Sequence, residues 1–589
     1  MRNPVSRFAY VSADLDIKRS QFSRNQDHKT TLSAGYLYPL FVDEVLPGDT
    51  YTVDLASLIR MSTPIHPVMD NCFLDTYWFF VPNRIVWDHW KEFMGEVPYD
   101  EYADHIDYSV PVLYCNKPTS ALNPPIVPFK SILDYLGVPA GTCPKEFNAL
   151  PVRGFCSIFN NWFMDQNLQN PINIDRSDAN LVYASVTNPT DIIGEFWSGN
   201  SINPELSDSY VINAAHGGDL PPVNKYHDYF TSALIAPQKG EPVPIPLSGF
   251  APVYATNLVD LAGSGNIPAA STDVRLKNPN STSLTRLNGN IFANAGLMAG
   301  QTNGSIPSGG TNYSAYFNNL GADLSSIAGV YASINDLRSA FQLQKFLEAD
   351  NRGGSRYREI LKNHFGVTSP DATQQIPEFL GGKRIQINMS QVLQTSATND
   401  VSPQGNTAAY SLTTDKYSAF TKSFTEHGFL FCVGCIRTDH TYTQGLEKFW
   451  SRKNKFDYYF PEFANISEQP IYNKEIYNGT YREDVSWELA EQIFGFQEAY
   501  GDYRYKPNRV SAEFRPTYPE SLSIWHYADY YTEQPYLSSD WIRETRSNID
   551  RTLAVNDSSI DQFIADFYFK IKTTRVMPVN SIPGLADHH

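Results

Sequence analysis

Apolar side chains are densest in residues 71–96, NCFLDTYWFFVPNRIVWDHWKEFMGE. The aromatic run at 72–81 predicts a buried strand, and Pro82 with Asn83 predicts the end of that strand and the N-cap of a short helix. We expect this helix to end at Gly95 and to place three side chains on one face: Trp87, Trp90 and Met94. The stretch is therefore predicted to be an internal scaffold element.

Alternating apolar and polar residues predict further strands that are widely separated along the chain. They are residues 34–50, 383–393, 429–437, 521–531 and 567–579, and the first of them is expected to open the β structure. Strands so far apart must pair non-locally, which is typical of sandwiches and jelly rolls and not of alternating βαβ folds. The pattern therefore predicts a mainly β protein.

Apolar residues at helical spacing predict four amphipathic helices in the long connections, at residues 126–136, 153–168, 336–350 and 356–364. Such a stripe more often faces a packed core than a cofactor. Between residues 251 and 329 the chain is instead rich in Gly, Ser, Asn, Thr and Ala. This composition predicts a long inserted surface loop.

The composition favours extensive contact with other chains. Aromatic residues make up 14% of the 589 residues and charged residues only 19%, and the cores of protein interfaces are rich in the former and poor in the latter. The net charge of -17 excludes a surface that binds nucleic acid throughout, so any DNA contact must be local. Residues 1–30 hold the DNA-contact candidates, although a solvated polar tail explains the same charges equally well: Arg2, Arg7, Lys18, Arg19, Arg24 and Lys29.

The six cysteines are too scattered for a disulfide framework. Cys432 and Cys435 have the spacing of half a zinc site, but no second pair is near in sequence, and residues three apart in a strand face opposite sides. We therefore expect both to be core residues. The N-terminus lacks an apolar signal core, and no apolar run is long enough to cross a bilayer, which indicates a chain that stays in the cytosol until it assembles.

No motif for a phosphate-binding loop, a nucleophile elbow, a zinc protease or an EF-hand occurs in the sequence. His427, Asp439 and His440 could form an acid–base group, but in this aromatic context we expect them to be hydrogen-bonded structure. The sequence therefore predicts no enzyme activity, catalytic residue, metal site or cofactor.

Five long blocks carry a resemblance to a known family, in the family's own order. They are residues 28–96, 337–367, 382–397, 427–463 (HGFLFCVGCIRTDHTYTQGLEKFWSRKNKFDYYFPEF) and 498–516 (EAYGDYRYKPNRVSAEFRP). The blocks closely resemble the major capsid proteins of microviruses, in particular the gokushovirus-like branch. The resemblance covers most of the chain and fails mainly between residues 168 and 331.

The resemblance implies a viral eight-stranded antiparallel jelly roll with long helical and loop insertions. Residues 31–589 would form a single capsid domain, and the basic residues 1–30 would form an interior arm. Sixty copies would assemble, in the cytoplasm of a bacterial host, into a T=1 icosahedral shell around circular single-stranded DNA, which a small basic packaging protein helps to neutralise. The candidates for the core or for assembly contacts are Trp78, Trp87, Trp90, Phe341, Tyr458, Tyr459 and Phe460.

In this family a variable insertion builds a protrusion at the threefold axis, so the same role is implied for residues 251–329. Its partner would be a receptor on the host cell surface, and a surface loop with no partner is the alternative. The attachment candidates are Arg275, Lys277, Arg286, Asn303, Asn312 and Tyr313.

Aromatic richness also fits a second class of protein, a carbohydrate-binding or carbohydrate-active β-sandwich. An enzyme of that class needs two carboxylates about 5 to 10 Å apart across a cleft, and the sequence alone pairs none. Particle size distinguishes the two hypotheses, because only the capsid protein would form megadalton assemblies.

Overall fold

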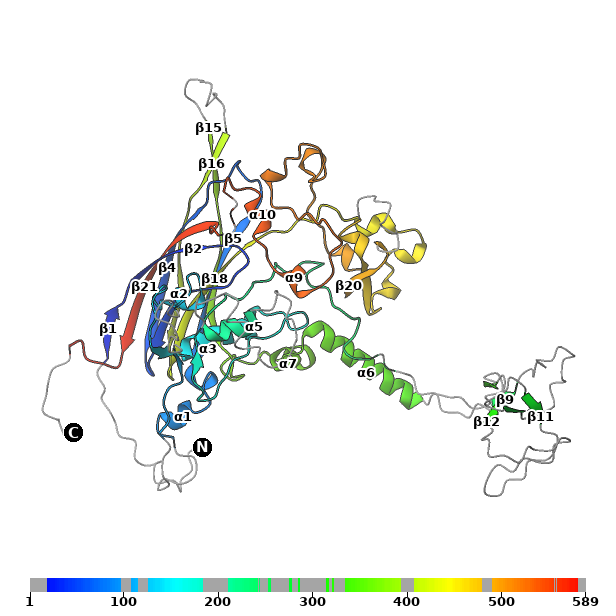
Figure 1. The fold of residues 1–589 in the computed structure, drawn as a ribbon, viewed down its shortest axis with the longest axis horizontal. Helices are drawn as coiled ribbons and strands as arrows, with labels where there is room; N and C mark the ends of the chain where they lie inside the picture. The colour runs from blue at the N-terminus through cyan, green and yellow to red at the C-terminus, as the bar shows by residue number, and fades with distance from the viewer. Residues whose placement is uncertain are drawn as a thin grey trace, which may run out of the picture. The chain divides into compact units, whose positions relative to one another are not determined.

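The computed structural model describes residues 19–96, 107–114, 126–183, 210–241, 334–393, 407–478, 490–555, 557 and 559–580, with isolated short segments between 243 and 322. The chain divides into two compact units, residues 1–239 with 348–589, and residues 240–347. The first unit is built around two large antiparallel sheets (Figure 1).

The first sheet brings the N-terminal strands of the chain beside its last strand. The order is β17-β4-β21, and both β1 and β2 pair with the other edge of β21. Buried and more exposed positions alternate along β4 and β21 because one face of the sheet packs on the core. The strands are β1 (Ser20–Ser23), β2 (Gln26–Leu32), β4 (Thr50–Met61), β17 (Thr413–Ser423) and β21 (Phe563–Arg575).

The second sheet has the order β14-β5-β18-β3. Its strands are β3 (Tyr38–Val45), β5 (Cys72–Pro82), β14 (Glu378–Gln386) and β18 (Gly428–Thr438). The central strands β5 and β18 are almost continuous buried runs because both of their faces are covered. Cys432 packs between the two sheets and Cys435 on the opposite face of β18, which confirms the expected core role of both residues.

Aromatic side chains fill the core between the two sheets. The ring of Trp78 lies 5.8 Å from that of Phe41 in its own sheet and 5.8 Å from that of Phe569 in the other. Phe41 and Phe569 are in turn 4.9 Å apart. Ring pairs at these separations stabilise a core beyond the area that they bury. The two sheets therefore form a sandwich with one shared core.

Helices cover the outer face of the second sheet. Phe155 and Phe159 pack there with Phe79 and Phe431 of the sheet. The helices are α1 (Trp90–Phe93), α2 (Ile132–Leu136), α3 (Leu150–Ile158), which continues into the π-helical turn η3 (Phe159–Phe163), and α5 (Tyr210–Asn213). Helix α2 ends at Gly137, whose φ of 97° forms the left-handed C-cap that favours glycine.

A third apolar cluster lies outside the sandwich. Phe230, Tyr442 and Phe494 pack there with Trp541. Its elements are β19 (Glu468–Tyr472), β20 (Ile493–Glu498) and α9 (Ser539–Ile542). The remaining elements of the first unit are β6 (Val112–Tyr114), β7 (Glu146–Asn148), β8 (Leu181–Val182), α7 (Tyr357–Phe365), β15 (Met389–Leu393), β16 (Thr407–Ser411) and α10 (Ser547–Asp550).

The second unit, taken by itself, is described in short antiparallel strands. They form a three-stranded sheet in the order β11-β10-β12 and a two-stranded sheet of β13 and β9. The strands are β9 (Val253–Ala255), β10 (Arg275–Lys277), β11 (Leu284–Arg286), β12 (Ser314–Tyr316) and β13 (Leu320–Ala322), and helix α6 (Ile334–Gly353) begins in this unit. The unit extends beyond the insertion predicted at residues 251–329.

The N-terminal boundary of the β structure differs from the prediction. Strands β1 and β2 precede the strand that was expected to open the fold, so residues 20–23 and 26–32 of the predicted arm 1–30 belong to the first sheet. Their sequence is polar because they form an edge of the sheet, where few side chains need burial. Residues 1–18 lie outside the described residues.

The strand predicted at residues 521–531 is wrong. The segment contains a 3-10 turn, η13 (Ser523–Trp525), and an irregular remainder. Its apolar residues are buried one at a time against loops: Trp525 stacks on His66 at 4.8 Å, and Tyr527 is buried in the sandwich core. The alternation in this segment therefore reflects packing against several loops and not a position in a sheet.

The helix predicted after Asn83 is also interrupted. A 3-10 turn, η2 (Asn83–Ile85), is separated from α1, and Pro82 occupies the N-cap position without a side-chain bond. Gly95 follows α1 with a φ of 96°, as expected of a residue that ends a helix. Within the described part of the chain, no helix has both the length and the apolarity that crossing a membrane requires.

Candidate functional site: an exposed aromatic surface

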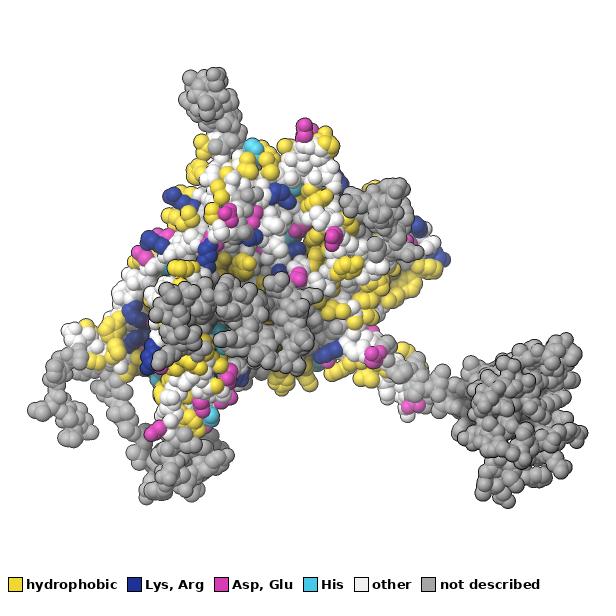
Figure 2. All heavy atoms as spheres, viewed as in Figure 1, with side chains coloured by type: hydrophobic (Ala, Val, Ile, Leu, Met, Phe, Trp, Pro, Cys, Tyr) yellow, Lys and Arg dark blue, Asp and Glu magenta, His cyan; other side chains and the backbone are white. Residues whose placement is uncertain are grey.

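Large apolar side chains that face solvent gather on residues 456–463. We call Phe456, Tyr458, Tyr459 and Phe460 the aromatic surface; all four are exposed. They lie on and between two short 3-10 turns, η8 (Lys455–Asp457) and η9 (Pro461–Phe463). Yellow side chains on this side of the molecule are visible in Figure 2. Contiguous apolar exposure of this kind marks an interaction site in a folded protein.

The aromatic surface is held in a defined conformation by local contacts. Asp457 caps η8 by accepting hydrogen bonds from the backbone of Lys453 and Asn454, both at 2.7 Å. The rings of Tyr459 and Tyr500 meet edge to face at 5.3 Å. Because this conformation exists before any partner binds, less ordering entropy is lost on binding.

A pocket of about 650 Å³ lies next to the aromatic surface. Its rim carries three exposed rings: Phe449, Trp450 and Tyr503. Phe449 and Trp450 belong to η7 (Lys448–Ser451), with ring centroids 4.7 Å apart, and Tyr503 belongs to η11 (Gly501–Tyr503). The floor includes Phe230 and Tyr442 of the third apolar cluster. The pocket is therefore built on a packed base.

Cations surround this pocket. Lys506 Nζ lies 2.5 Å from Glu447 Oε2, and Arg509 pairs with the other oxygen of the same carboxylate. Hydrogen bonds from Lys506 and Arg509 lower the pKa of Glu447. The guanidinium of Arg452 stacks on Tyr503 at 4.2 Å and pairs with Asp502. The pocket thus combines aromatic faces with positive charge.

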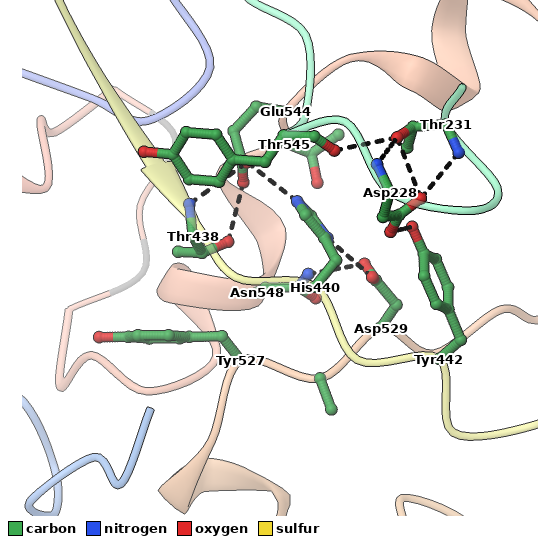
Figure 3. A network of polar contacts seen from close by, with 12 residues as sticks. Asp228, Thr231, Thr438, His440, Tyr442, Tyr527, Asp529, Glu544, Thr545 and Asn548 are labelled. Carbon is green, nitrogen blue, oxygen red and sulfur yellow. Dashed lines mark hydrogen bonds and ion pairs between the residues drawn. The ribbon is translucent and has the colours of Figure 1, made fainter. Parts of the chain in front are cut away.

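A buried polar network supports the loops that carry these surfaces (Figure 3). His440 receives two carboxylates: its Nδ1 lies 2.7 Å from Asp529 Oδ2 and its Nε2 lies 2.9 Å from Glu544 Oε2. Glu544 also accepts from the Thr438 hydroxyl at 3.0 Å, and Asp529 accepts from Asn548 at 2.8 Å. The network therefore ties the end of β18 to two later segments of the chain.

The electrostatics of this network favour a protonated histidine. Burial lowers the pKa of His440, but Asp529 and Glu544 outweigh it and raise that pKa to about 10. Burial acts in the opposite direction on Asp529, where the nearby charges of His440 and Lys225 hold the pKa below its usual range. In the described residues, no group of three or more His, Cys, Asp or Glu side chains could hold a metal ion. The network is therefore a structural ion cluster, as expected for His440.

Comparison with known proteins identifies the family. Residues 12–585 match the family model described as Capsid protein (F protein). The chain belongs to this capsid protein family. Its relatives include the Capsid protein VP1 of three viruses: Chlamydia phage 1 (36% identity over 610 residues, 98% of each chain), Bdellovibrio phage phiMH2K (37% over 590, 99% of this chain and 98% of the relative) and Spiroplasma virus 4 (37% over 564, 95% and 94%).

Family membership confirms the resemblance to the major capsid proteins of microviruses. It also confirms the interpretation of the chain as a structural, non-enzymatic protein of the virion, which acts by assembling with other copies of itself. The carbohydrate-active alternative has no comparable support.

The structure places the core and assembly candidates of this capsid protein in two different environments. Trp78 and Trp87 have 0% exposure, and Trp90 is half-buried. Phe341, on α6, is 62% exposed. The other three candidates are members of the aromatic surface: Tyr458, Tyr459 and Phe460.

The described DNA-contact candidates of the capsid protein lie at the first sheet. Arg24 makes a bidentate pair with Asp43, at 2.6 and 2.7 Å, which gives its guanidinium a structural partner. Arg19 donates to the Gly48 carbonyl at 3.3 Å, and exposed Lys29 lies 3.4 Å from Asp566. The remaining candidates lie outside the described residues: Arg2, Arg7 and Lys18.

The attachment candidates are described only in part. Arg275 and Lys277 lie on β10 and Arg286 on β11, where Arg275 is directly opposite Arg286 in the antiparallel register. Three others lie outside the described residues: Asn303, Asn312 and Tyr313.

Sequence reasoning missed the pocket beside the aromatic surface. Its cations Arg504, Lys506 and Arg509 stand in the block EAYGDYRYKPNRVSAEFRP, which was used only for the resemblance. The alternation of basic and aromatic residues in YRYKPNR was the available signal. The partner ring, Trp450, is about 50 residues away in the chain, so only the fold brings the two together.

Proposed function

We infer that sixty copies of this capsid protein form a T=1 icosahedral shell, and that the sandwich of each copy is an eight-stranded jelly roll. The observation that carries the fold proposal is the strand order. Counted along the chain without the short edge strand β1, the eight strands give the orders 1-8-3-6 and 5-4-7-2 in the two sheets. Two interlocked Greek keys have this arrangement, in which the first and last strands are neighbours.

Self-assembly assigns a role to the aromatic surface. Tyr458, Tyr459 and Phe460 are exposed in the single chain, and their removal from water would contribute to a stable contact between copies. Obligate interfaces bury about 2,000 to 5,000 Å² and are more apolar than ordinary surface. Phe341 is proposed to serve in the same way at a second contact.

The genome of the proposed shell is circular single-stranded DNA. With a net charge of -17 the capsid protein supplies little neutralising charge of its own, so a small basic packaging protein is the expected partner. Residues 1–18, which include Arg2, Arg7 and Lys18, would extend to the genome inside the shell. Assembly would take place in the cytoplasm of a bacterial host.

The insertion is proposed to form a protrusion at the threefold axis and to bind a receptor on the host. Support comes from its separation as a compact unit, residues 240–347, and from the resemblance, which fails in the same region. A receptor-binding segment would diverge between phages of different hosts.

Sedimentation and electron microscopy of the purified full chain test the shell proposal. The expected result is a megadalton particle with icosahedral symmetry, and a chain that stays monomeric at every concentration would overturn it. Deletion of residues 251–329 tests the insertion. We expect particles that assemble but adsorb poorly to host cells, whereas loss of soluble folding would refute the separation of roles.

A further inference from the structure

The pocket beside the aromatic surface has the composition of a site for a planar, anionic ligand. Its volume of about 650 Å³ lies within the range of about 300 to 1,000 Å³ that is usual for ligand sites. Trp450 is 66% exposed although it is a large apolar ring, and only one neighbouring ring, Phe449, lies against it at 4.7 Å. An accessible indole face next to cations is suited to stack a nucleic-acid base.

The acidic groups at the pocket do not cancel its positive charge. Lys506 and Arg509 share the single carboxylate of Glu447, so this trio has an excess of one positive charge. The side chains of Lys506 and Arg509 are 71% and 61% exposed, whereas that of Glu447 is only 19% exposed. The cations therefore stand outermost, where a phosphate group would first meet them.

One wall of the pocket contains an acceptor without a donor. Asp502 uses Oδ2 to pair with Arg452, and its Oδ1 is buried with no hydrogen-bond partner among the described residues. Such atoms are rare in folded proteins unless a ligand or water satisfies them. Asp502 and Arg452 also line a neighbouring pocket of about 300 Å³, so the two hollows adjoin. An N–H group on the edge of a base would satisfy this oxygen.

We propose that this pocket binds a short run of single-stranded nucleic acid, with a base on Trp450, a base-edge donor at Asp502 and the backbone phosphates at Lys506 and Arg509. The inference rests on the proposed function, because it assigns a contact to the single-stranded genome. It also places the pocket on the inner side of the shell. Ordinary surface ion pairs would account for the cations, but not for the accessible indole and the unsatisfied acidic oxygen beside them.

Fluorescence anisotropy with a labelled dT octamer, using the unassembled full chain, tests the proposal. We expect Trp450→Ala to weaken binding by about tenfold or more, since stacking of one base contributes that much. The matched control is Phe365→Ala, which removes a ring with 71% exposure on α7, and it should leave binding unchanged. Trp450→Phe keeps an aromatic face and should recover most of the affinity.

The phosphate contacts are tested by a double variant. Lys506→Gln with Arg509→Gln should weaken octamer binding and reduce its dependence on salt by about two phosphate contacts. The control is Lys91→Gln with Lys145→Gln, which removes two exposed lysines that likewise stand near glutamates. An abasic octamer and free dTMP separate the two parts of the ligand, and both should bind more weakly than the dT octamer.

Three results would overturn the proposal: equal binding of abasic and dT octamers, Trp450→Ala binding like Phe365→Ala, or Trp450→Ala binding normally but failing to assemble. The last would assign Trp450 to a contact with a second copy. Circular dichroism melting of each variant excludes misfolding as the cause. Sedimentation of the wild-type chain is scored separately, so an absence of particles counts against the shell and not against the pocket.

Discussion

The sandwich core and the aromatic surface use the same residue types in opposite ways. Trp78 and Phe569 are fully buried between two sheets, whereas Tyr458 and Phe460 are exposed on short turns. In the core each ring has neighbours from several strands, so its burial stabilises the single chain. On the surface the rings contact mainly one another, so their burial requires another molecule. Aromatic content alone therefore does not distinguish a folding residue from an assembly residue.

The His440 network shows a third use of buried side chains. It has no aromatic packing role, and it joins the end of β18 to the segments around Asp529 and Glu544 through charge. Gly35 is adjacent to this junction and has a φ of 91°, and a Cβ there would collide with the Glu544 carbonyl oxygen. The network and this close approach together hold the loops that the sheets alone do not hold.

The largest effect is expected in the core. Trp78→Ala or Trp87→Ala should lower the free energy of unfolding by about 3 to 5 kcal/mol, because each leaves a cavity at a fully buried site. Trp90→Ala, at a half-buried site, should cost less than about 2 kcal/mol. Urea denaturation of unassembled chains measures all three, and near-equal stability of the three variants would contradict the packing described for them.

His440→Gln should cost about 3 to 5 kcal/mol, because it leaves two carboxylates buried without their cation. The pH dependence has a defined sign. Since the pKa of His440 in the folded chain is raised from 6.5 to about 10, its contribution is complete below pH 6.5 and is lost as the pH rises through about 10. Thermal melts between pH 6 and 10 should show a steeper loss of stability for the wild type than for His440→Gln, and parallel curves would contradict this.

The aromatic surface should show the reverse of the core. Tyr458→Ser with Phe460→Ser should change the stability of the unassembled chain by less than about 1 kcal/mol, since exposed sites contribute little to folding. Particle yield should nevertheless fall sharply, because rings at an interface centre often contribute about 2 kcal/mol or more each. Sedimentation gives the yield and denaturation the stability. Normal particle yield would remove these residues from the interface.

The smallest effect is expected at Lys29. Its side chain is 69% exposed and its pair with Asp566 spans 3.4 Å, so Lys29→Gln should change stability by less than about 0.5 kcal/mol. Arg24→Gln, which breaks the bidentate pair with Asp43, is the matched comparison and should cost more. Equal melting temperatures for the two variants would show that the pair at Arg24 is as weak as a surface contact.

Sequence reasoning succeeded where burial dictates the residue type. The run at 72–81 and the strand at 429–437 are continuous or nearly continuous apolar segments, and both are central strands of the second sheet. It failed at β4 and β17, which were not predicted, and at residues 521–531. β17 has a polar exposed face, and the partners of residues 521–531 are loops distant in the chain. Local pattern contains no information about such partners.

The sequence by itself determined that this is a mainly β capsid protein without an enzyme's motifs, because long ordered blocks and the buried strands leave a direct record in residue type. Only the tertiary structure decided which aromatic residues are buried and which are exposed. It alone brought His440 to Asp529 and Glu544, and Trp450 to Lys506 and Arg509. The reason is physical: burial and electrostatic pairing depend on distance in space, and these partners are separated by tens of residues along the chain.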